Sequence, residues 1–374
     1  FWKLSARRTE KRDEQEWIEQ IQQALQLAVD RRLEISDVPV GVLLSGGLDS
    51  SLLVGLLAQK HGEVNTYSVG FEDQPEERGN EFEYSDAVVE RFSTKHHRFH
   101  IPNEQVLTRL PEAIRCMPEP MVAQDAVAFY LLAEQVSKDI KVVQSGQGAD
   151  EVFAGYFWYP KMHVAKGSYI ERFSSFYFDR DFDEYTKTVN AAYVQQDYTS
   201  RLVSEALENS DSDTFIDAVL QFDVSTLIVD DPVKRVDSMT MAWGLEARVP
   251  FLDHELVELA MQMPPEMKLK EDGKYVLKKI ARGLIPDSVI DRPKGYFPMP
   301  ALKYVRGDFL EMVRDTLTSD ACIQRGLFSR DYVNTLLNAP DKYHTRLQGS
   351  KIWHMALLEQ WLQANVDGAA YPSR

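Results

Sequence analysis

In the first part of the chain, segments whose hydrophobic residues recur at helical spacing alternate with short, continuous hydrophobic runs. Between Glu14 and Arg32, apolar residues recur at helical spacing, which is typical of an amphipathic helix. Val40–Leu44 is instead a short apolar run, as expected for a buried strand. The same alternation continues downstream. The pattern predicts helices at 14–32, 50–60, 82–95 and 126–138, and strands at 40–44, 66–71, 97–101 and 141–144.

Strands that alternate with helices predict an α/β fold with a doubly wound parallel sheet. Ligands of such sheets bind in the crevice at the carboxyl ends of the strands. Glycine-rich turns at 45–47 and 145–148 follow two of the predicted strands, so both turns should face one crevice. After about residue 155 the strand signal fades, and residues 160–290 are expected to be mostly helical.

Four segments are therefore expected along the chain. They are an N-terminal helix or linker at 1–35, an α/β core at 36–160, a largely helical C-terminal extension at 161–366 and a disordered tail at 367–374. No low-complexity linker separates them.

The composition excludes several classes of protein. The 374 residues carry a formal net charge of −16, which argues against a nucleic-acid partner. No apolar run is as long as a membrane span, and the polar residues 1–12 do not resemble a signal peptide. The two cysteines, Cys116 and Cys322, indicate a reducing compartment, so a cytoplasmic location is expected. Because the chain begins with Phe1, we expect that a preceding segment has been removed.

The first glycine turn reads Ser-Gly-Gly-Leu-Asp-Ser-Ser at 45–51. Its glycines permit backbone dihedrals that let successive N–H groups point at an anion at a helix N-terminus. Asp49 would repel a phosphate on its own, but it is a reasonable ligand for Mg²⁺ held against phosphates. The turn lacks the Gly-Lys-Ser/Thr ending of a Walker A loop. A tight turn without a ligand is the alternative, and the strand, helix and acid together disfavour it.

The second glycine turn reads Ser-Gly-Gln-Gly-Ala-Asp-Glu at 145–151 and also opens a helix. Acids in a first helical turn suit the helix dipole, so Asp150 and Glu151 could serve only as capping residues. If the two turns share a crevice, Asp150 is instead a candidate for a second Mg²⁺ ligand, opposite Asp49.

Two later blocks make the pattern specific. Residues 243–253 read Trp-Gly-Leu-Glu-Ala-Arg-Val-Pro-Phe-Leu-Asp, and residues 292–297 read Arg-Pro-Lys-Gly-Tyr-Phe. The first turn resembles the pyrophosphate loop of the ATP pyrophosphatases. Together, in this order, the turns and blocks resemble the synthetase domain of the asparagine synthetases, which are glutamine-dependent amidotransferases. The resemblance covers about residues 14–300 and implies an adenine nucleotide alpha hydrolase-like fold that uses ATP and Mg²⁺.

The resemblance assigns roles to the residues at matching positions. Leu44 and Val69 would flank the adenine, and Asp49 and Asp150 would bind Mg²⁺. Lys294 would be catalytic, neutralising the α-phosphate as pyrophosphate leaves. The residues expected to hold pyrophosphate or to line the acyl-adenylate are Ser45, Gly46, Gly47, Asp49, Ser50, Ser51, Ser145, Gly146, Gln147 and Asp150.

Three further charged residues leave two interpretations open. Lys274 is a weaker second candidate for phosphate binding, and a solvated surface charge is the alternative, more so for Lys274 than for Lys294. Glu246 is a candidate catalytic acid, with Asp253 as another acid of the substrate side. An internal salt bridge with Arg248 is an equally good interpretation of these two acids.

Gln147 is a departure from the asparagine synthetases, which have Ser-Gly-Glu-Gly in the second loop. A neutral amide cannot accept a proton from the attacking amine, so aspartate as the acceptor is in doubt. The stretches 119–130 and 143–160 resemble the N-acetylglutaminylglutamine amidotransferases, which amidate a dipeptide. Nearby aromatic residues either line an acceptor pocket or pack in the core: Tyr156, Trp158 and Tyr159.

The implied reaction has two steps. A small carboxylate or short peptide attacks the α-phosphorus of ATP to give an acyl-adenylate and pyrophosphate, and ammonia then displaces AMP. The family obtains ammonia from an N-terminal glutaminase domain that begins with cysteine, which this chain lacks, so the full-length protein should carry about two hundred more residues. A homodimer is also an expectation. The alternatives are aspartate amidation, β-lactam-type ring closure, modification of transfer RNA (disfavoured by the acidic charge) and a non-catalytic nucleotide sensor.

Overall fold

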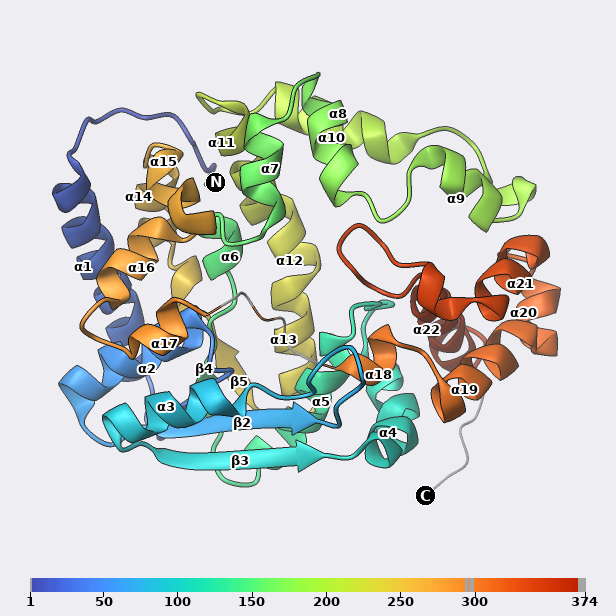
Figure 1. The fold of residues 1–374 in the computed structure, drawn as a ribbon, viewed down its shortest axis with the longest axis horizontal. Coiled ribbons are helices and arrows are strands. Elements are labelled where there is room, and N and C mark those ends of the chain that lie inside the picture. The colour runs from blue at the N-terminus through green and yellow to red at the C-terminus, as the bar shows by residue number, and fades with distance from the viewer. Residues whose placement is uncertain (1, 293–294, 296–298, 369–374) are drawn as a thin grey trace.

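The computed structural model describes residues 2–292, 295 and 299–368. At its centre is a five-stranded, all-parallel sheet with the strand order β3-β2-β1-β4-β5. This confirms the expected α/β class with a doubly wound parallel sheet. The strands, labelled in Figure 1, are β1 Val40–Leu43, β2 Asn65–Phe71, β3 Lys95–Ile101, β4 Val142–Gln144 and β5 Glu246–Arg248.

The fifth strand was not predicted, although the segment 160–290 that contains it is otherwise mostly helical, as expected. Glu246–Arg248 forms three parallel register pairs with β4, of which Val142 with Glu246 is the first. A three-residue strand with a charge at both ends has no apolar run, so its own pattern cannot reveal it. It forms because the backbone N–H and C=O groups at the otherwise unpaired edge of β4 form hydrogen bonds with it.

Helices around the sheet confirm most of the predicted elements with shifted ends. The helix predicted at 82–95 stops at Phe92, because Ser93 adopts a left-handed backbone with a φ of 50° and β3 begins at Lys95. The helix α4 was not predicted and contains Pro111. The helices of this half are α1 Glu14–Glu34, α2 Leu48–His61, α3 Phe82–Phe92, α4 Asn103–Cys116, α5 Asp125–Val136 and α6 Ala149–Val152.

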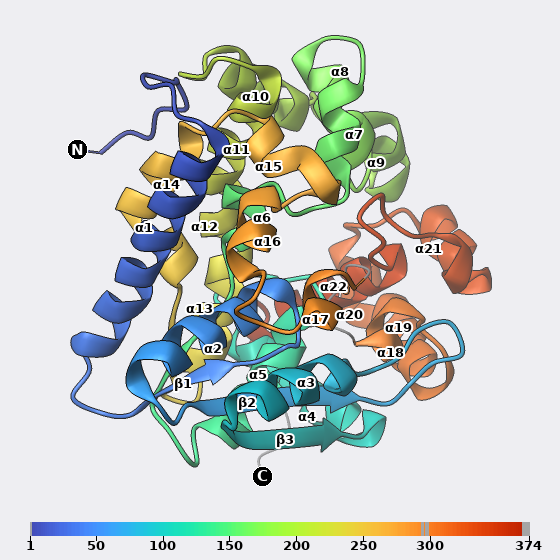
Figure 2. The same ribbon diagram turned by 60° about the vertical axis from the view of Figure 1, so that its left-hand side comes forward.

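The sheet separates two hydrophobic cores. Successive residues of a strand point to opposite faces, so Val42 and Leu44 join one core while Leu43 joins the other. Helices α1, α2 and α3 contribute to the first core, and α4 and α5 to the second (Figure 2). The N-terminal helix α1 is part of the fold: a capping box at Asp13 starts it, and its residue Trp17 is fully buried.

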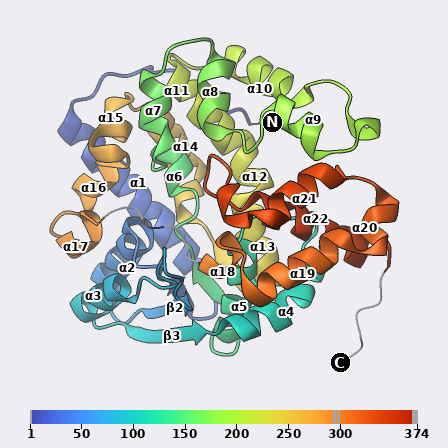
Figure 3. The ribbon, with the colours of Figure 1, turned by 45° about the vertical axis from the view of Figure 1, so that its right-hand side comes forward.

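The C-terminal extension is largely helical, as expected, and contributes to both cores. In Figure 3 its last helices lie beside α4 and α5, and α22 contacts α4. The prediction for the tail at 367–374 lies outside the described residues beyond residue 368. The helices of this half are α7 Trp158–Val164, α8 Tyr169–Tyr177, α9 Phe182–Thr188, α10 Tyr198–Glu208, α11 Phe215–Phe222, α12 Ile228–Asp230, α13 Pro232–Met241, α14 His254–Met261, α15 Glu266–Leu269, α16 Tyr275–Ala281, α17 Asp287–Ile290, α18 Pro300–Lys303, α19 Gly307–Thr318, α20 Asp320–Arg325, α21 Arg330–Asn338 and α22 Lys351–Asn365.

Candidate active site

The two glycine loops meet at the carboxyl edge of the sheet. They follow β1 and β4, which are adjacent strands, so the topology brings their ends side by side. The loops are in close contact: a Cβ atom added to Gly146 would lie 3.0 Å from the Cβ of Asp49 and 3.2 Å from the backbone nitrogen of Ser50. Position 146 therefore has no room for a larger residue unless the loops separate.

The first loop is shaped to present backbone N–H groups. Gly46 has a φ of +77°, and a Cβ there would lie 2.8 Å from the nitrogen of Ser85, so only glycine fits. The hydroxyl of Ser50 accepts a hydrogen bond from the Ser45 N–H at 3.2 Å and holds the turn closed. Helix α2 begins immediately after Gly47, which provides no side-chain cap. The N-terminal N–H groups of a 14-residue helix are thus aimed at the loop, an arrangement that binds anions.

Lys274 joins the two loops. Its Nζ lies 2.5 Å from Oδ2 of Asp49 and 2.9 Å from Oδ1 of Asp150. The side chain is only 9% exposed, so the interpretation of Lys274 as a solvated surface charge is wrong. Burial alone would lower the pKa of Lys274, but the charges of Asp150 and Asp49 outweigh burial and raise it well above its ordinary value. The lysine therefore stays charged between the carboxylates.

Backbone dihedrals with a positive φ place Lys274 between the two loops. Glu271, Asp272 and Lys274 all have a positive φ, and the Lys274 N–H donates to the carbonyl of Phe153 at 3.0 Å. Such dihedrals cost free energy in residues other than glycine, of order 1–3 kcal/mol each, and persist where the surroundings enforce them. The sequence named Lys274 as the second candidate for phosphate binding, but the irregular backbone at 271–274 has no local pattern that could show its place between Asp49 and Asp150.

A cavity of about 680 Å³ opens over the loops. Both predicted adenine-flanking residues, Leu44 and Val69, line it. Gly46 and Ser51 do not line it; both are buried, Ser51 completely. Lys294 lies outside the described residues. The other predicted site residues in the lining are Ser45, Gly47, Asp49, Ser50, Ser145, Gly146, Gln147, Asp150 and Lys274. We call this cavity the nucleotide cavity.

Glu246 lies away from the nucleotide cavity. It is the first residue of β5 and pairs with Val142 at the amino end of β4, opposite the edge that carries the loops. Its Oε1 lies 2.7 Å from Nε of Arg248, and the Glu246 side chain is 54% exposed. Asp253 accepts a hydrogen bond from Arg32 at 2.6 Å and caps α14. The geometry matches the internal salt bridge for Glu246 and a structural role for Asp253, so neither is carried forward as catalytic.

Sequence reasoning missed Arg292 as a cation at the cavity. Arg292 lines it and pairs with Glu81, with 2.9 Å between Nη2 and Oε1. The guanidinium also lies over the ring of Tyr84, 4.4 Å from its centroid. Arg292 belongs to the Arg-Pro-Lys block on which the resemblance partly rests. Its place two residues before the candidate Lys294 is the sequence feature that could have identified it as a site residue.

Three residues line both the nucleotide cavity and a second, neighbouring cavity: Asp125, Tyr156 and Arg235. Nε of Arg235 lies 2.8 Å from Oδ1 of Asp125. The Tyr156 hydroxyl donates to Oε1 of Glu151 at 2.7 Å, and its ring stacks on Trp158 with 4.3 Å between centroids. Tyr156 and Trp158 thus face cavities, whereas Tyr159 is fully buried in the core.

The donor set at the loops fits a magnesium ion. Asp49 and Asp150 converge on one ammonium group, so their carboxylates are close enough to share a small cation. Carboxylate oxygens are the protein ligands that Mg²⁺ prefers, usually alongside substrate phosphates.

The helices of the described residues are too short or too polar for any of them to cross a lipid bilayer.

Residues 20–363 match the family model described as asparagine synthase. Asparagine synthetase [glutamine-hydrolyzing] 1 of Bacillus subtilis is 29% identical over 402 aligned residues, which cover 96% of this chain and 61% of the relative. Asparagine synthetase [glutamine-hydrolyzing] 1 of Arabidopsis thaliana is 28% identical, covering 74% of this chain and 42% of that protein.

The chain spans at most 61% of the length of these curated relatives. The family model covers most of the chain, including both glycine loops, Lys274 and the block at 243–253. On that match, this chain belongs to the asparagine synthase family.

Proposed function

We propose that this chain is the ATP-dependent synthetase part of a glutamine-hydrolysing amidotransferase. It would activate a carboxylate as an acyl-adenylate, with release of pyrophosphate, and convert it to an amide with ammonia. The observation that carries the proposal is the convergence of Asp49, Asp150 and Lys274 where two backbone-lined loops meet. A charged, buried cation beside an anion-binding helix N-terminus is suited to the triphosphate of ATP.

Each residue of the site would have a defined part in the first step. Leu44 and Val69 would contact the adenine, and the N–H groups of the first loop would hold the pyrophosphate. A carboxylate oxygen of the acceptor bonds to the α-phosphorus while the bond to the bridging oxygen breaks and pyrophosphate leaves. Lys274 offers a compact positive charge to the growing negative charge of the leaving group.

Asp49 and Asp150 would also hold Mg²⁺, which neutralises phosphate charge when bound. Lys294 remains a prediction for the α-phosphate, since it lies outside the described residues. In the second step, the nitrogen of ammonia bonds to the acyl carbon, AMP leaves, and one proton is lost from nitrogen. Gln147 lines the cavity but has no carboxylate to take that proton.

We propose N-acetylglutaminylglutamine as the acceptor, with aspartate as the alternative. The resemblance of the stretches at 119–130 and 143–160 supports the dipeptide, as does Gln147 where asparagine synthetases have glutamate. The names of the relatives, which are asparagine synthetases, support aspartate. Ammonia would come from a glutaminase domain outside this chain, and a cytoplasmic homodimer is the expected form of the protein.

Exchange of labelled pyrophosphate into ATP tests the proposal. The chain is incubated with Mg²⁺, ATP and one carboxylate at a time: aspartate, glutamate and N-acetylglutaminylglutamine. We expect exchange with at least one carboxylate and, when ammonium is added, formation of the amide and AMP. Asp49→Asn should abolish exchange while circular dichroism shows a folded chain. Exchange that needs no carboxylate, or none with any of the three, would contradict the proposal.

A further inference from the structure

Arg292 is a buried cation beside the first glycine loop. It follows α17, which contacts both α2 and α3 and lies beside them in Figure 1. Its side chain is 7% exposed and lines the nucleotide cavity. A Cβ atom added to Gly47 would lie 3.8 Å from Nη2 of Arg292. Because Gly47 is the N-cap residue of α2, the guanidinium lies next to the N–H groups to which we assign the pyrophosphate.

The start of α3 holds the guanidinium in this position. Nη2 of Arg292 donates to Oε1 of Glu81 at 2.9 Å, and the guanidinium lies over the ring of Tyr84. The same part of α3 packs against the glycine loop. A Cβ atom added to Gly46 would lie 2.9 Å from the Cβ of Tyr84 and 3.2 Å from the carbonyl oxygen of Glu81. The loop, the start of α3 and Arg292 therefore form one packed unit.

The other cations of the nucleotide cavity are engaged elsewhere. Among the described residues, four lysine or arginine side chains line it. Lys274 and Arg235 each lie between two carboxylates, and Lys278 donates to the backbone carbonyl of Glu271. Arg292 instead pairs with a single carboxylate, through one nitrogen atom. It is thus the cation with the most capacity left for an anionic ligand at the first loop.

Glu81 is a weak partner for this guanidinium. Burial raises the pKa of Glu81, the charge of Arg292 opposes that effect, and the charge of Glu77 adds to it. Attraction within a buried ion pair often fails to repay the lost hydration of both groups. A phosphate carries more negative charge than a carboxylate and forms stronger hydrogen bonds with a guanidinium than neutral acceptors do. A phosphate beside Gly47 would therefore compete with Glu81 for Arg292.

We propose that Arg292 binds the outer phosphates of ATP and the pyrophosphate that they become, and that Glu81 holds the guanidinium in place until the nucleotide binds. The inference rests on the proposed function, since it adds a residue to the pyrophosphate site. The contact is made by Nη2, the atom that lies nearest Gly47. Lys274 lies between the two glycine loops and Arg292 on the α3 side of the first loop, so the two cations approach the phosphates from different sides.

Direct binding measurements test the assignment without any acceptor. Titration calorimetry gives Kd values for inorganic pyrophosphate, ATP and AMP, each with Mg²⁺, for the wild-type chain and for Arg292→Met, Arg292→Lys and Glu81→Gln. Arg98→Met is the matched control. Arg98 also pairs with an acid of α3, Asp86 at 2.9 Å, and lies over an aromatic ring of α3, that of Phe82 at 4.1 Å, but it lines neither this cavity nor the neighbouring one.

We expect Arg292→Met to raise the Kd for pyrophosphate and for ATP by about 30-fold, the usual size for a lost hydrogen bond to a charged group. The Kd for AMP should not change, because AMP lacks the outer phosphates. Arg292→Lys keeps the charge and should raise the Kd for pyrophosphate by only about fivefold. Glu81→Gln should lower it by about threefold, because Arg292 no longer shares its charge with a carboxylate. Arg98→Met should change none of these values.

The opposite signs at Arg292 and Glu81 separate phosphate binding from a structural role. If the pair only fixed α3 against the loop, both variants would weaken binding, and AMP would be affected as much as pyrophosphate. That outcome, or an unchanged Kd for pyrophosphate in folded Arg292→Met, would overturn the assignment. If circular dichroism shows that Arg292→Met does not fold, the more conservative Arg292→Lys and Glu81→Gln decide. Binding of pyrophosphate that depends on Arg292, with no exchange on any carboxylate, would support the assignment and overturn the proposed function alone.

Discussion

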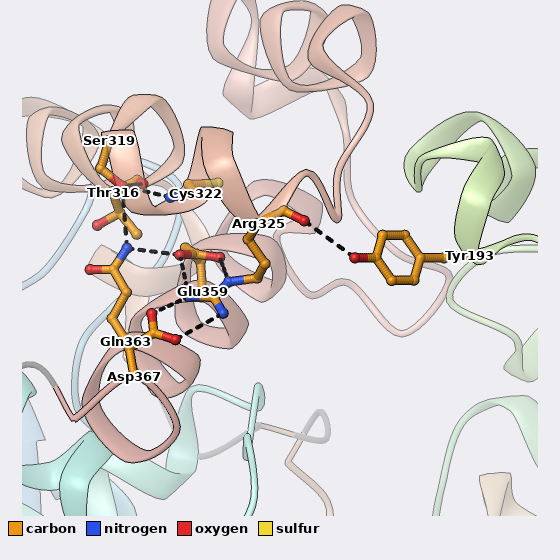
Figure 4. A network of polar contacts seen from close by, with 8 residues as sticks. All are labelled: Tyr193, Thr316, Ser319, Cys322, Arg325, Glu359, Gln363 and Asp367. Atoms are coloured by element: carbon orange, nitrogen blue, oxygen red, sulfur yellow. Dashed lines mark hydrogen bonds and ion pairs between the residues drawn. The ribbon is translucent and has the colours of Figure 1, made fainter.

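Two cations of this chain, Lys274 and Arg325, are each held between two carboxylates. Arg325, the last residue of α20, donates to both oxygens of Glu359, at 3.0 and 3.3 Å, and also pairs with Asp367 (Figure 4). Glu359 is fully buried and accepts a further hydrogen bond from Gln363 at 2.8 Å. In Figure 4 the pair lies among packed C-terminal helices.

The surroundings of the two cations differ. Arg325 lines neither the nucleotide cavity nor the neighbouring second cavity, and its partners belong to α22 and the residues just after it. Lys274 lines the nucleotide cavity, and its partners Asp49 and Asp150 come from two separate loops. The comparison teaches that a cation held between two carboxylates indicates chemistry only where it borders a space that a ligand can enter.

The largest effect is expected at Lys274. Lys274→Met should lower the rate of pyrophosphate exchange by roughly 10³-fold, about 4 kcal/mol, because it removes the charge that faces the leaving pyrophosphate. Lys279→Met is the matched control, since Lys279 is on the neighbouring α16, is 37% exposed and does not line the cavity. Equal rates for the two folded variants would mean that Lys274 only joins the loops.

Arg325 should affect stability instead of activity. Arg325→Met leaves Glu359 charged and buried without its partner, so the free energy of unfolding should fall by about 3 kcal/mol. Urea denaturation measures the loss, and exchange per folded molecule should be unchanged. The double variant Arg325→Met/Glu359→Gln should recover part of the stability. A loss of exchange in the folded single variant would show that the C-terminal helices take part in the chemistry.

Lys268 is a buried cation that lacks the pairing of Lys274 and Arg325. It is fully buried, its Nζ has no hydrogen-bond partner among the described residues, and the nearby Asp217 is already paired with Arg8 at 2.7 Å. Burial lowers the pKa of Lys268 to about 8, against an opposing effect of the Asp217 charge. Lys268→Met should therefore raise the free energy of unfolding at pH 7 by about 2 kcal/mol.

The sign of the pH dependence provides the control for Lys268. Between about pH 8 and pH 10.5 the unfolded chain binds a proton that the folded chain has released. The charged Lys268 destabilises the folded chain fully below this window. Across the window the folded chain becomes more stable as the pH rises, because the destabilisation is lost. Denaturation midpoints at pH 7 and pH 9.5 should show a gain from Lys268→Met that shrinks at the higher pH. A gain that is independent of pH would contradict the lowered pKa.

The smallest effect is expected at Glu246. Glu246→Gln weakens a half-exposed ion pair with Arg248, which is worth less than about 0.5 kcal/mol. Neither the exchange rate nor the denaturation midpoint should change measurably. A tenfold loss of exchange would return Glu246 to the set of catalytic candidates and would require the amino edge of the sheet to reach the substrate.

Local sequence pattern predicted most of the α/β core. The run at 40–44 is a strand because it is apolar over its own length, and the glycine turn at 45–47 is a loop because glycine readily adopts the positive φ of Gly46. Such features depend on neighbouring residues alone, so they can be read from the chain. Asp49 could be identified as a site residue from its neighbours alone, because it is an acid within an anion-binding turn.

The sequence by itself determined the residue types of the site: two glycine loops, the carboxylates Asp49 and Asp150, and a lysine somewhere downstream. Only the tertiary structure decided which lysine stands between them, that Glu246 faces the other edge of the sheet, and that a second cavity shares part of its lining with the nucleotide cavity. Local residues fix a turn or a strand, whereas a contact between segments more than two hundred residues apart depends on how the whole chain packs.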